Sequence, residues 1–265
     1  MVNQFLLSLI SGIAVGGVAG YLGALMLQKR MALTAGPLGH LAFPGVAIAL
    51  AYGFNISLGA FPFIILGIFL IWLLEIKTKI PTEALTALIF ATGVSISFLF
   101  LPMEKAEAAL IGNITSISWQ DALITVLLSF IVFMIVRKIF AQMILINISE
   151  DLAKIEGVNI KKYNLIYLLS IAVIVALGVK LVGVLLTAAL VAVPAATARN
   201  LSRSMKGYYI LSLFFGILAP IIGLVIFKIT NLPAGVLIII SGAVLFLLSV
   251  FFKDKLIYNH YSDVV

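Results

Sequence analysis

The sequence predicts an all-helical (all-α) polytopic transmembrane protein that crosses a lipid bilayer about nine times. Hydrophobic residues make up 63% of its 265 residues, charged residues make up only 10%, and the mean hydropathy is +1.26. Soluble domains carry about 25% charged residues, so lipid rather than water must surround most of this surface. The hydrophobic residues also gather into runs of about 20, the length that a spanning helix requires.

Nine apolar runs follow one another along the chain. The sixth and seventh are short and are divided only by the hexapeptide GVKLVG, so the alternative is eight spans, with one of this pair re-entrant. No polar linker interrupts the series, which favours a single transmembrane domain over residues 1–265. The nine runs cover residues 5–27, 32–54, 57–75, 84–102, 120–140, 164–179, 181–198, 208–228 and 233–252.

The lysines and arginines indicate the orientation of the chain. If loops alternate between sides and the N-terminus lies outside, only Lys105, Lys180 and Lys228 fall on the outer side, and every other lysine and arginine falls on the inner side. Positive residues concentrate in cytoplasmic loops, so we expect a cytoplasmic C-terminus. The first run follows MVNQ, with no positive charge before it, and is therefore expected to be a retained spanning helix rather than a signal peptide.

Charge and composition also argue against several functions. The net charge of +7 is explained by topology and by attraction to anionic lipids of the inner leaflet, which makes nucleic-acid binding an improbable function. The absence of cysteine excludes disulfides and thiolate metal ligands. The chain also lacks a G-x-x-x-x-G-K-[ST] phosphate loop, so ATP-driven work would require hydrolysis in a separate subunit. The sequence therefore predicts a membrane protein that is not itself an enzyme.

The inner loop SEDLAKIEG, residues 149–157, predicts a short helix on the cytoplasmic surface. Ser149 can cap its N-terminus, and Glu150 and Asp151 suit the positive end of the helix dipole. Leu152, Ile155 and, more weakly, Ala153 form a small apolar face, and Gly157 can adopt the left-handed conformation that ends a helix. The segment is either a solvated connector or a helix that docks into a partner.

The stretch GPLGHLAFPG, residues 36–45, places one histidine among glycines and prolines inside an apolar run. Pro44 removes the helical hydrogen bond to the carbonyl of His40, and Pro37 removes the bond to that of Leu33. Irregular backbone at membrane depth lies either against protein or along a wet cavity. His40 is accordingly either a packing residue or a group on a substrate path, where neutral imidazole could bind a divalent metal.

Two other runs are rich in small residues. Residues 182–200, VGVLLTAALVAVPAATARN, contain Pro194, which is expected to bend the helix, and their alanines suit either close helix packing or a helix that lines a path. The first run carries Gly12, Gly16 and Gly20 at a spacing of four residues. This pattern predicts a tight helix contact, either within the chain or with a second copy of it.

Together these motifs resemble the permease subunits of the metal-type ABC importers, the family that moves zinc, manganese or iron. VGVLLTAALVAVPAATA (182–198) resembles the family's V-G-x-L-L…P-A-A-x-A signature, and GHLAFPGVA (39–47) resembles its S-H-A-x-x-P-G-V-A segment. SEDLAKIEG (149–157) is similar to its D-x-E-x-A-x-x-x-G segment, and LIGNITSIS (110–118) is similar to its outer-loop G-N-I/L segment.

The resemblance implies a homodimeric permease in the inner (plasma) membrane, with an ABC ATPase as a separate partner subunit. It also implies an extracytoplasmic solute-binding protein that delivers a divalent metal ion as substrate. By the same resemblance, residues 149–157 dock on the ATPase through Glu150, Asp151, Ala153 and Gly157, and His40 belongs to a transient metal site.

The chain departs from the family pattern at two positions. Gly36 replaces the aspartate that the family usually carries four residues before the histidine, and Ser149 replaces the aspartate that opens the docking segment. One imidazole with carbonyl oxygens would hold a divalent ion weakly, which is compatible with conduction or with a changed substrate. The alternatives are therefore an ABC permease with a non-metal substrate, a self-sufficient secondary carrier or channel, or a scaffold of a membrane complex.

Overall fold

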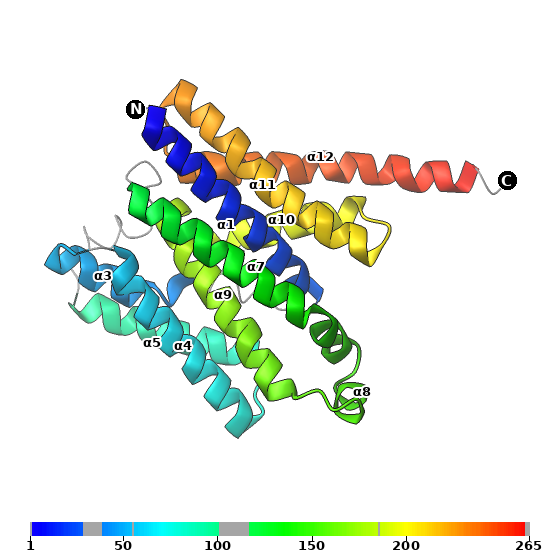
Figure 1. Cartoon of the computed structure of the whole chain (residues 1–265), viewed down its shortest axis with the longest axis horizontal. Coiled ribbons are helices and arrows are strands. Elements are labelled where there is room, and N and C mark those ends of the chain that lie inside the picture. The colour runs from blue at the N-terminus through cyan, green and yellow to red at the C-terminus, as the bar shows by residue number, and fades with distance from the viewer. Residues whose placement is uncertain (1, 29–38, 55, 101–116, 185, 263–265) are drawn as a thin grey trace.

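The fold is entirely helical over the residues that the structure describes. This computed structural model describes residues 2–28, 39–54, 56–100, 117–184 and 186–262, and these contain no β-strand (Figure 1). The helices are α1 (Val2–Gln28), α3 (Phe43–Tyr52), α4 (Ile56–Thr78), α5 (Thr82–Phe100), α7 (Trp119–Ile148), α8 (Glu150–Ile155), α9 (Ile160–Val182), α10 (Thr187–Leu201), α11 (Met205–Thr230) and α12 (Ala234–Ser262).

Six of these helices are long and apolar enough to cross a bilayer, namely α1, α4, α7, α9, α11 and α12. The prediction of about nine spans, or of eight as the alternative, is therefore not supported by the described residues. Helices α3 and α10 have only 10 and 15 residues. Helix α3 has Pro44 in its first turn and ends at Gly53, and α10 begins only after the interruption at Gly183. The apolar stretch Thr82–Ile96 of α5 is also shorter than the six helices that are long enough to span a bilayer.

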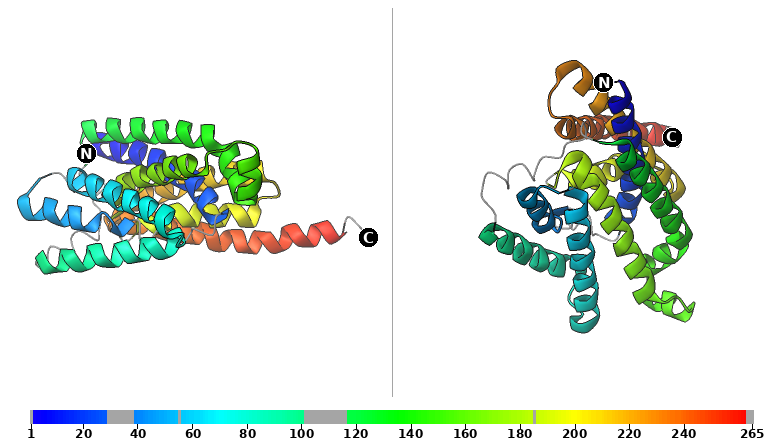
Figure 2. Two further views of the ribbon diagram at one scale, coloured as in Figure 1. Left: turned by 90° about the horizontal axis from the view of Figure 1, so that it is seen from below. Right: turned by 60° about the vertical axis from the view of Figure 1, so that its left-hand side comes forward.

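The helices form two groups that α9 joins. Helices α3, α4 and α5 pack against one another, whereas α10, α11 and α12 pack together with α1. Helix α9 contacts α4 on one side and α1, α7, α10 and α12 on the other. About two thirds of its apolar stretch is buried inside the protein. Figures 1 and 2 show this arrangement, with α12 extending beyond the rest of the molecule toward the C-terminus. Helix α9 is thus the central element of the fold.

The glycines of α1 make a contact within the chain. A Cβ atom on Gly16 would overlap the carbonyl oxygen of Gly216 in α11, and one on Gly20 would overlap that of Ser212. One helical turn further, Gly23 lies directly against the carbonyl of Val191 in α10. Residues without a Cβ let the two backbones approach this closely, so the predicted tight contact of the first helix is with α11 and α10.

Gly16→Ala should destabilise the fold by about 1–3 kcal/mol, because the new methyl group meets backbone that cannot rotate away. Gly93→Ala is the matched control: it is also a helical glycine, but its Cβ would lie 3.7 Å from Pro44 Cγ, an ordinary contact. Thermal unfolding in detergent should show a lower midpoint for the first variant and an unchanged midpoint for the second. Equal midpoints would contradict the packing described for α1.

The boundary between the sixth and seventh apolar runs differs from the prediction. Helix α9 continues through the GVKLVG hexapeptide to Val182 and is capped by Gly183, whose φ of 94° is strained for residues other than glycine. Helix α10 begins at Thr187 and continues past Pro194, which is buried inside it. The helix is therefore interrupted before α10, at Gly183, and it is continuous through the proline.

Candidate functional site

The short helix α8 forms as the sequence predicts. The Ser149 hydroxyl accepts a hydrogen bond from the backbone N–H of Leu152 at 3.3 Å, which satisfies one of the free N–H groups of the first turn. Gly157 adopts a φ of 74°, and the Val158 N–H donates back to the carbonyl of Ala153 at 2.8 Å. Six residues are too few to stay helical alone, so α8 depends on its contacts with α7 and α9.

Only one residue of α8 faces the rest of the protein. Ala153 is fully buried, whereas Leu152 is 49% exposed and Ile155 is 80% exposed. The three residues were grouped as one apolar face from the sequence, but the structure turns Ala153 inward and leaves the two larger side chains at the surface. The methyl group of Ala153 thus lets α8 approach α7 and α9 closely while its bulky apolar residues remain available to a partner.

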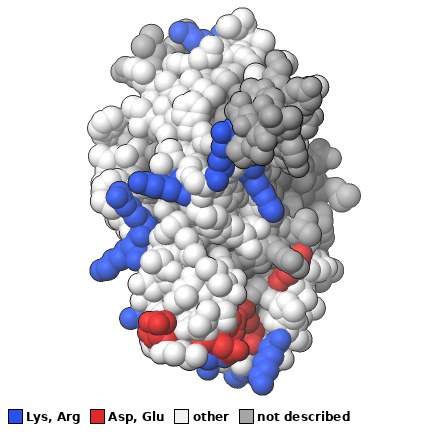
Figure 3. Space-filling model, turned by 90° about the vertical axis from the view of Figure 1, so that its right-hand side faces the viewer, with Lys and Arg blue, Asp and Glu red and all other residues white. Residues whose placement is uncertain are grey.

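The surface of α8 is also strongly acidic. Glu150, Asp151 and Glu156 are all exposed. Figure 3 shows carboxylates at the lower end of this face, with Lys and Arg side chains beside them and further Lys and Arg side chains above. A 3.0 Å ion pair with Asp151, which accepts a hydrogen bond from the Lys154 ammonium, raises the pKa of Lys154. Exposed apolar side chains next to exposed carboxylates suit a partner with an apolar groove and basic groups beside it.

His40 lies where two interrupted helical segments meet. A Cβ on Gly39 would lie 3.1 Å from the carbonyl oxygen of Val184 and 3.6 Å from Cβ of Thr187, so its backbone touches the chain between α9 and α10. The Thr187 hydroxyl donates to the carbonyl of Gly183 at 2.6 Å and closes that turn. The structure therefore brings together the two motifs, residues 36–45 and 182–200, that the sequence singled out separately.

The backbone around His40 is irregular, as predicted, but the irregularity is a break rather than a bend. Residues 39 and 40 are helical, residues 41 and 42 form a turn, and Pro44 lies in the first turn of α3, where a missing N–H costs no helical bond. The half-buried His40 ring packs on Phe90 of α5, with centroids 5.0 Å apart and ring planes at 35°. Gly36 and Pro37 lie outside the described residues.

Among the described residues, His40 does not belong to a cluster of metal-binding side chains. Within the part of the chain that the structure describes, no three His, Cys, Asp or Glu side chains come together. A metal ion passing His40 would therefore be held by the imidazole, by backbone carbonyls and by water. Such a ligand set fits brief contact with a moving ion better than tight binding.

One feature that sequence reasoning missed lies at the opposite end of α9 from α8. Lys180 Nζ lies 2.6 Å from Asp121 Oδ1 of α7, and both side chains are mostly buried. Asp121 also forms a capping box with Ser118, since each residue's side chain accepts a hydrogen bond from the other's backbone N–H. The S-x-x-D spacing could have revealed the cap, but the pairing with Lys180 spans 59 residues and had no local signal.

Comparison with known proteins agrees with this arrangement of helices. Residues 1–253 match the profile of the family described as "ABC 3 transport family". The chain belongs to this family. The six long apolar helices among its described residues and its membership of the ABC 3 transport family make it a multi-pass integral membrane protein.

Relatives of known name cover almost the whole chain. A manganese import system permease protein of Streptococcus parasanguinis, ScaB, is 29% identical over 252 residues, which are 94% of this chain and 90% of that protein. A high-affinity zinc uptake system membrane protein of Haemophilus influenzae, ZnuB, is 27% identical over 94% of this chain and 97% of its own length. Relatives whose names give different metals are thus similarly distant from this chain.

Solved structures resemble the fold equally well. PsaBC from Streptococcus pneumoniae, solved in complex with a Fab, superimposes with a TM-score of 0.74 at 28% identity, over 94% of this chain and 95% of that chain. An inward-facing putative metal-chelate type ABC transporter has a TM-score of 0.72, covering 93% of this chain and 85% of its own. At 19% identity, the second likeness concerns the fold alone.

Proposed function

We propose that this chain is the permease subunit of an ATP-driven importer of divalent metal ions, with manganese, zinc or iron as the cargo. Membership of the ABC 3 transport family and the metals in the names of its relatives support this function. The observation that carries it is the presentation of α8: Ala153 holds the helix to the bundle, while Leu152, Ile155 and the carboxylates face outward. A separate ATPase docks on this surface.

The complex is a homodimer of this chain with two copies of the ATPase, and an extracytoplasmic binding protein delivers the ion to the outer face. The N-terminus lies outside and the C-terminus in the cytoplasm, with the shorter α3, α5 and α10 completing nine crossings. Two contacts support this alternation. Trp72 of α4 donates to the carbonyl of Lys161 in α9 at 3.2 Å, at the proposed inner side, and Lys180 pairs with Asp121 at the proposed outer side.

The path of coupling follows the fold. Helix α8 contacts the start of α9, and α9 is a buried rod of 23 residues, about 35 Å long, that ends at Gly183. Beyond Gly183 the chain touches Gly39, next to His40. When ATP closes the ATPase pair and displaces α8, rigid α9 carries the movement to the junction at His40. The interrupted backbone there changes shape more easily than continuous helix, which opens the path to alternate sides.

The uptake experiment tests this function directly. The chain, its ATPase and its binding protein are reconstituted in liposomes, and accumulation of Mn²⁺, Zn²⁺ and Fe²⁺ is measured with and without ATP. We expect at least one of these ions to accumulate only when ATP is present. ATP-independent accumulation would instead indicate a secondary carrier, and ATP hydrolysis without uptake of any of the three would exclude them as cargo.

The proposed orientation can be tested with single cysteines, because the native chain has none. Lys228→Cys and Lys77→Cys both introduce an exposed thiol, at the proposed outer and inner sides respectively. A membrane-impermeant maleimide should label Lys228→Cys in intact cells, and it should label Lys77→Cys only after the cells are opened. The reverse pattern would show that the chain is inverted in the membrane.

A further inference from the structure

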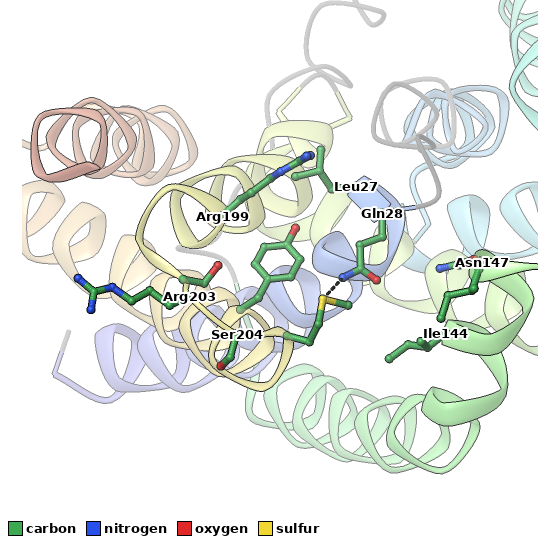
Figure 4. Close-up of a pocket in the computed structure, with 11 residues that line it drawn as sticks. Leu27, Gln28, Ile144, Asn147, Arg199, Arg203 and Ser204 are labelled. Carbon is green, nitrogen blue, oxygen red and sulfur yellow. Dashed lines mark hydrogen bonds between the residues drawn. The ribbon is translucent and has the colours of Figure 1, made fainter. Parts of the chain in front are cut away.

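A cavity of about 650 Å³ opens between the ends of α1, α7, α10 and α11, close to the start of α8. The C-terminal ends of α1 and α7 form one side, and the turn between α10 and α11 forms the other (Figure 4). Its volume is in the range of pockets that hold small ligands. Neither the proposed docking helix α8 nor His40 contributes a described lining residue to this cavity.

The cavity is lined by hydrogen-bond donors that lack partners. Tyr208 is only 5% exposed, and its buried hydroxyl has no hydrogen-bond partner within the described structure. The side-chain amide of Asn147 is buried at both its nitrogen and its oxygen, again without a partner among the described residues. Unsatisfied buried polar groups cost free energy, and both residues line this one cavity, so a ligand that reaches these groups would relieve that cost.

The charge of the lining specifies an anion. Arg199 lines the cavity, and no Asp or Glu is among the described residues that line it. The N-terminus of the 26-residue helix α11, capped by Ser204, adds its positive dipole end. Gln28 contributes an amide nitrogen, which makes a long and therefore weak contact of 3.5 Å to the sulfur of Met205, shown dashed in Figure 4. These are the groups that recognise a phosphate.

The rim of the cavity is apolar. Leu27, Ile144, Ile148 and Met205 line it, and Ile148 and Met205 are 71% and 51% exposed. A freely soluble phosphate would leave this apolar rim uncovered, whereas the glycerol and first methylene groups of a lipid would cover it. Basic pockets between transmembrane helices on the cytoplasmic side are suited to anionic lipid head groups.

We infer that this cavity binds a phosphate group, and that the phosphate belongs to an anionic phospholipid of the cytoplasmic leaflet. Arg199 pairs with the phosphate charge, while the Tyr208 hydroxyl and the Asn147 and Gln28 amides donate to its oxygens. The assignment to the cytoplasmic leaflet rests on the proposed orientation, but the cavity and its donors do not. Lipid bound here would join α1, α7 and α11 next to the proposed docking helix.

Native mass spectrometry of the full-length chain in detergent tests this inference without transport or orientation. Phosphatidylglycerol, phosphatidylcholine and inorganic phosphate are the three probes. We expect phosphatidylglycerol to bind in preference to phosphatidylcholine, and Arg199→Gln and Tyr208→Phe each to weaken its binding at least about tenfold, the effect of a hydrogen bond to a charged group. Lys206→Gln is the matched control, because this exposed cation on the same turn does not line the cavity.

Tyr208→Phe also separates binding from folding. Because the hydroxyl has no hydrogen-bond partner among the residues that the structure describes, its removal should leave the lipid-free thermal midpoint unchanged or higher, while the rise in midpoint on adding phosphatidylglycerol shrinks. Inorganic phosphate that binds with the same dependence on Arg199 would support the phosphate site and identify a soluble ligand. Equal binding of phosphatidylglycerol to the native chain, Arg199→Gln and Lys206→Gln would overturn the site, and so would no binding of either phosphate probe.

Discussion

The double variant Glu150→Lys with Asp151→Lys is expected to lose its ATPase. Both carboxylates are exposed on α8, so their reversal leaves the transmembrane bundle intact while it places two positive charges against the proposed basic groups of the partner. We expect the affinity for the ATPase to fall at least about tenfold and ATP-dependent uptake to fall in proportion. Co-purification of the ATPase with the tagged chain measures the first effect, and liposome uptake measures the second.

Two controls separate docking from damage to the helix. Glu83→Lys also reverses an exposed carboxylate in the first turn of a helix, α5, and therefore has the same unfavourable effect on a helix dipole. It should keep the ATPase. Leu152→Ala with Ile155→Ala removes the exposed apolar surface without changing charge and should weaken co-purification as well. If the double lysine variant transports at the native rate, α8 is not the docking helix.

Replacement of His40 by Phe is expected to reduce metal uptake at least about tenfold, although the protein folds normally. A phenyl ring can keep the packing on Phe90 at the 5.0 Å centroid distance, but it offers no nitrogen to an ion. Loss of even an indirect partner of a metal site costs about 10- to 100-fold in affinity or activity, and a direct ligand should cost no less. The measurement is the initial rate of ATP-driven ion uptake in liposomes.

The matched control is Phe90→Leu, which removes the ring contact and keeps the imidazole. Uptake should survive in this variant and fail in His40→Phe if the nitrogen is what matters. Gly36→Asp is a second test of this site, because a carboxylate four residues before His40 in the sequence should hold the ion longer or change which metal is preferred. If His40→Phe and Gly36→Asp both take up metal ions at the native rate, the ion path does not pass His40.

Local sequence signals predicted the elements whose geometry is local. Ser149 and Gly157 delimit α8 because a cap and a left-handed glycine act within a few residues. The apolar runs likewise located every described helix that is long enough to span a membrane, since lipid requires continuous helix. Runs alone could not show that α9 continues past Lys180 to Val182, because a buried charged residue looks like a boundary until its partner Asp121 is known.

The remainder of the site depends on contacts between distant segments. No sequence pattern showed that Gly16 would meet Gly216, or that Gly39 would touch the chain after Gly183. The cavity between α1, α7 and α11 was missed for the same reason. Tyr208 and Asn147 each look like an ordinary residue near a helix end, and only their convergence makes a site.

The most direct test of the account is the reactivity of one thiol on α8. Ile155→Cys would give the chain a single cysteine at a position that is 80% exposed in the isolated chain. Its rate of reaction with a maleimide should be high for the chain alone and at least about tenfold lower once the ATPase is bound, because a docked partner covers the side chain. Identical rates in the free chain and in the assembled complex would mean that α8 does not touch the ATPase, and the proposed route from ATP hydrolysis to His40 would be wrong.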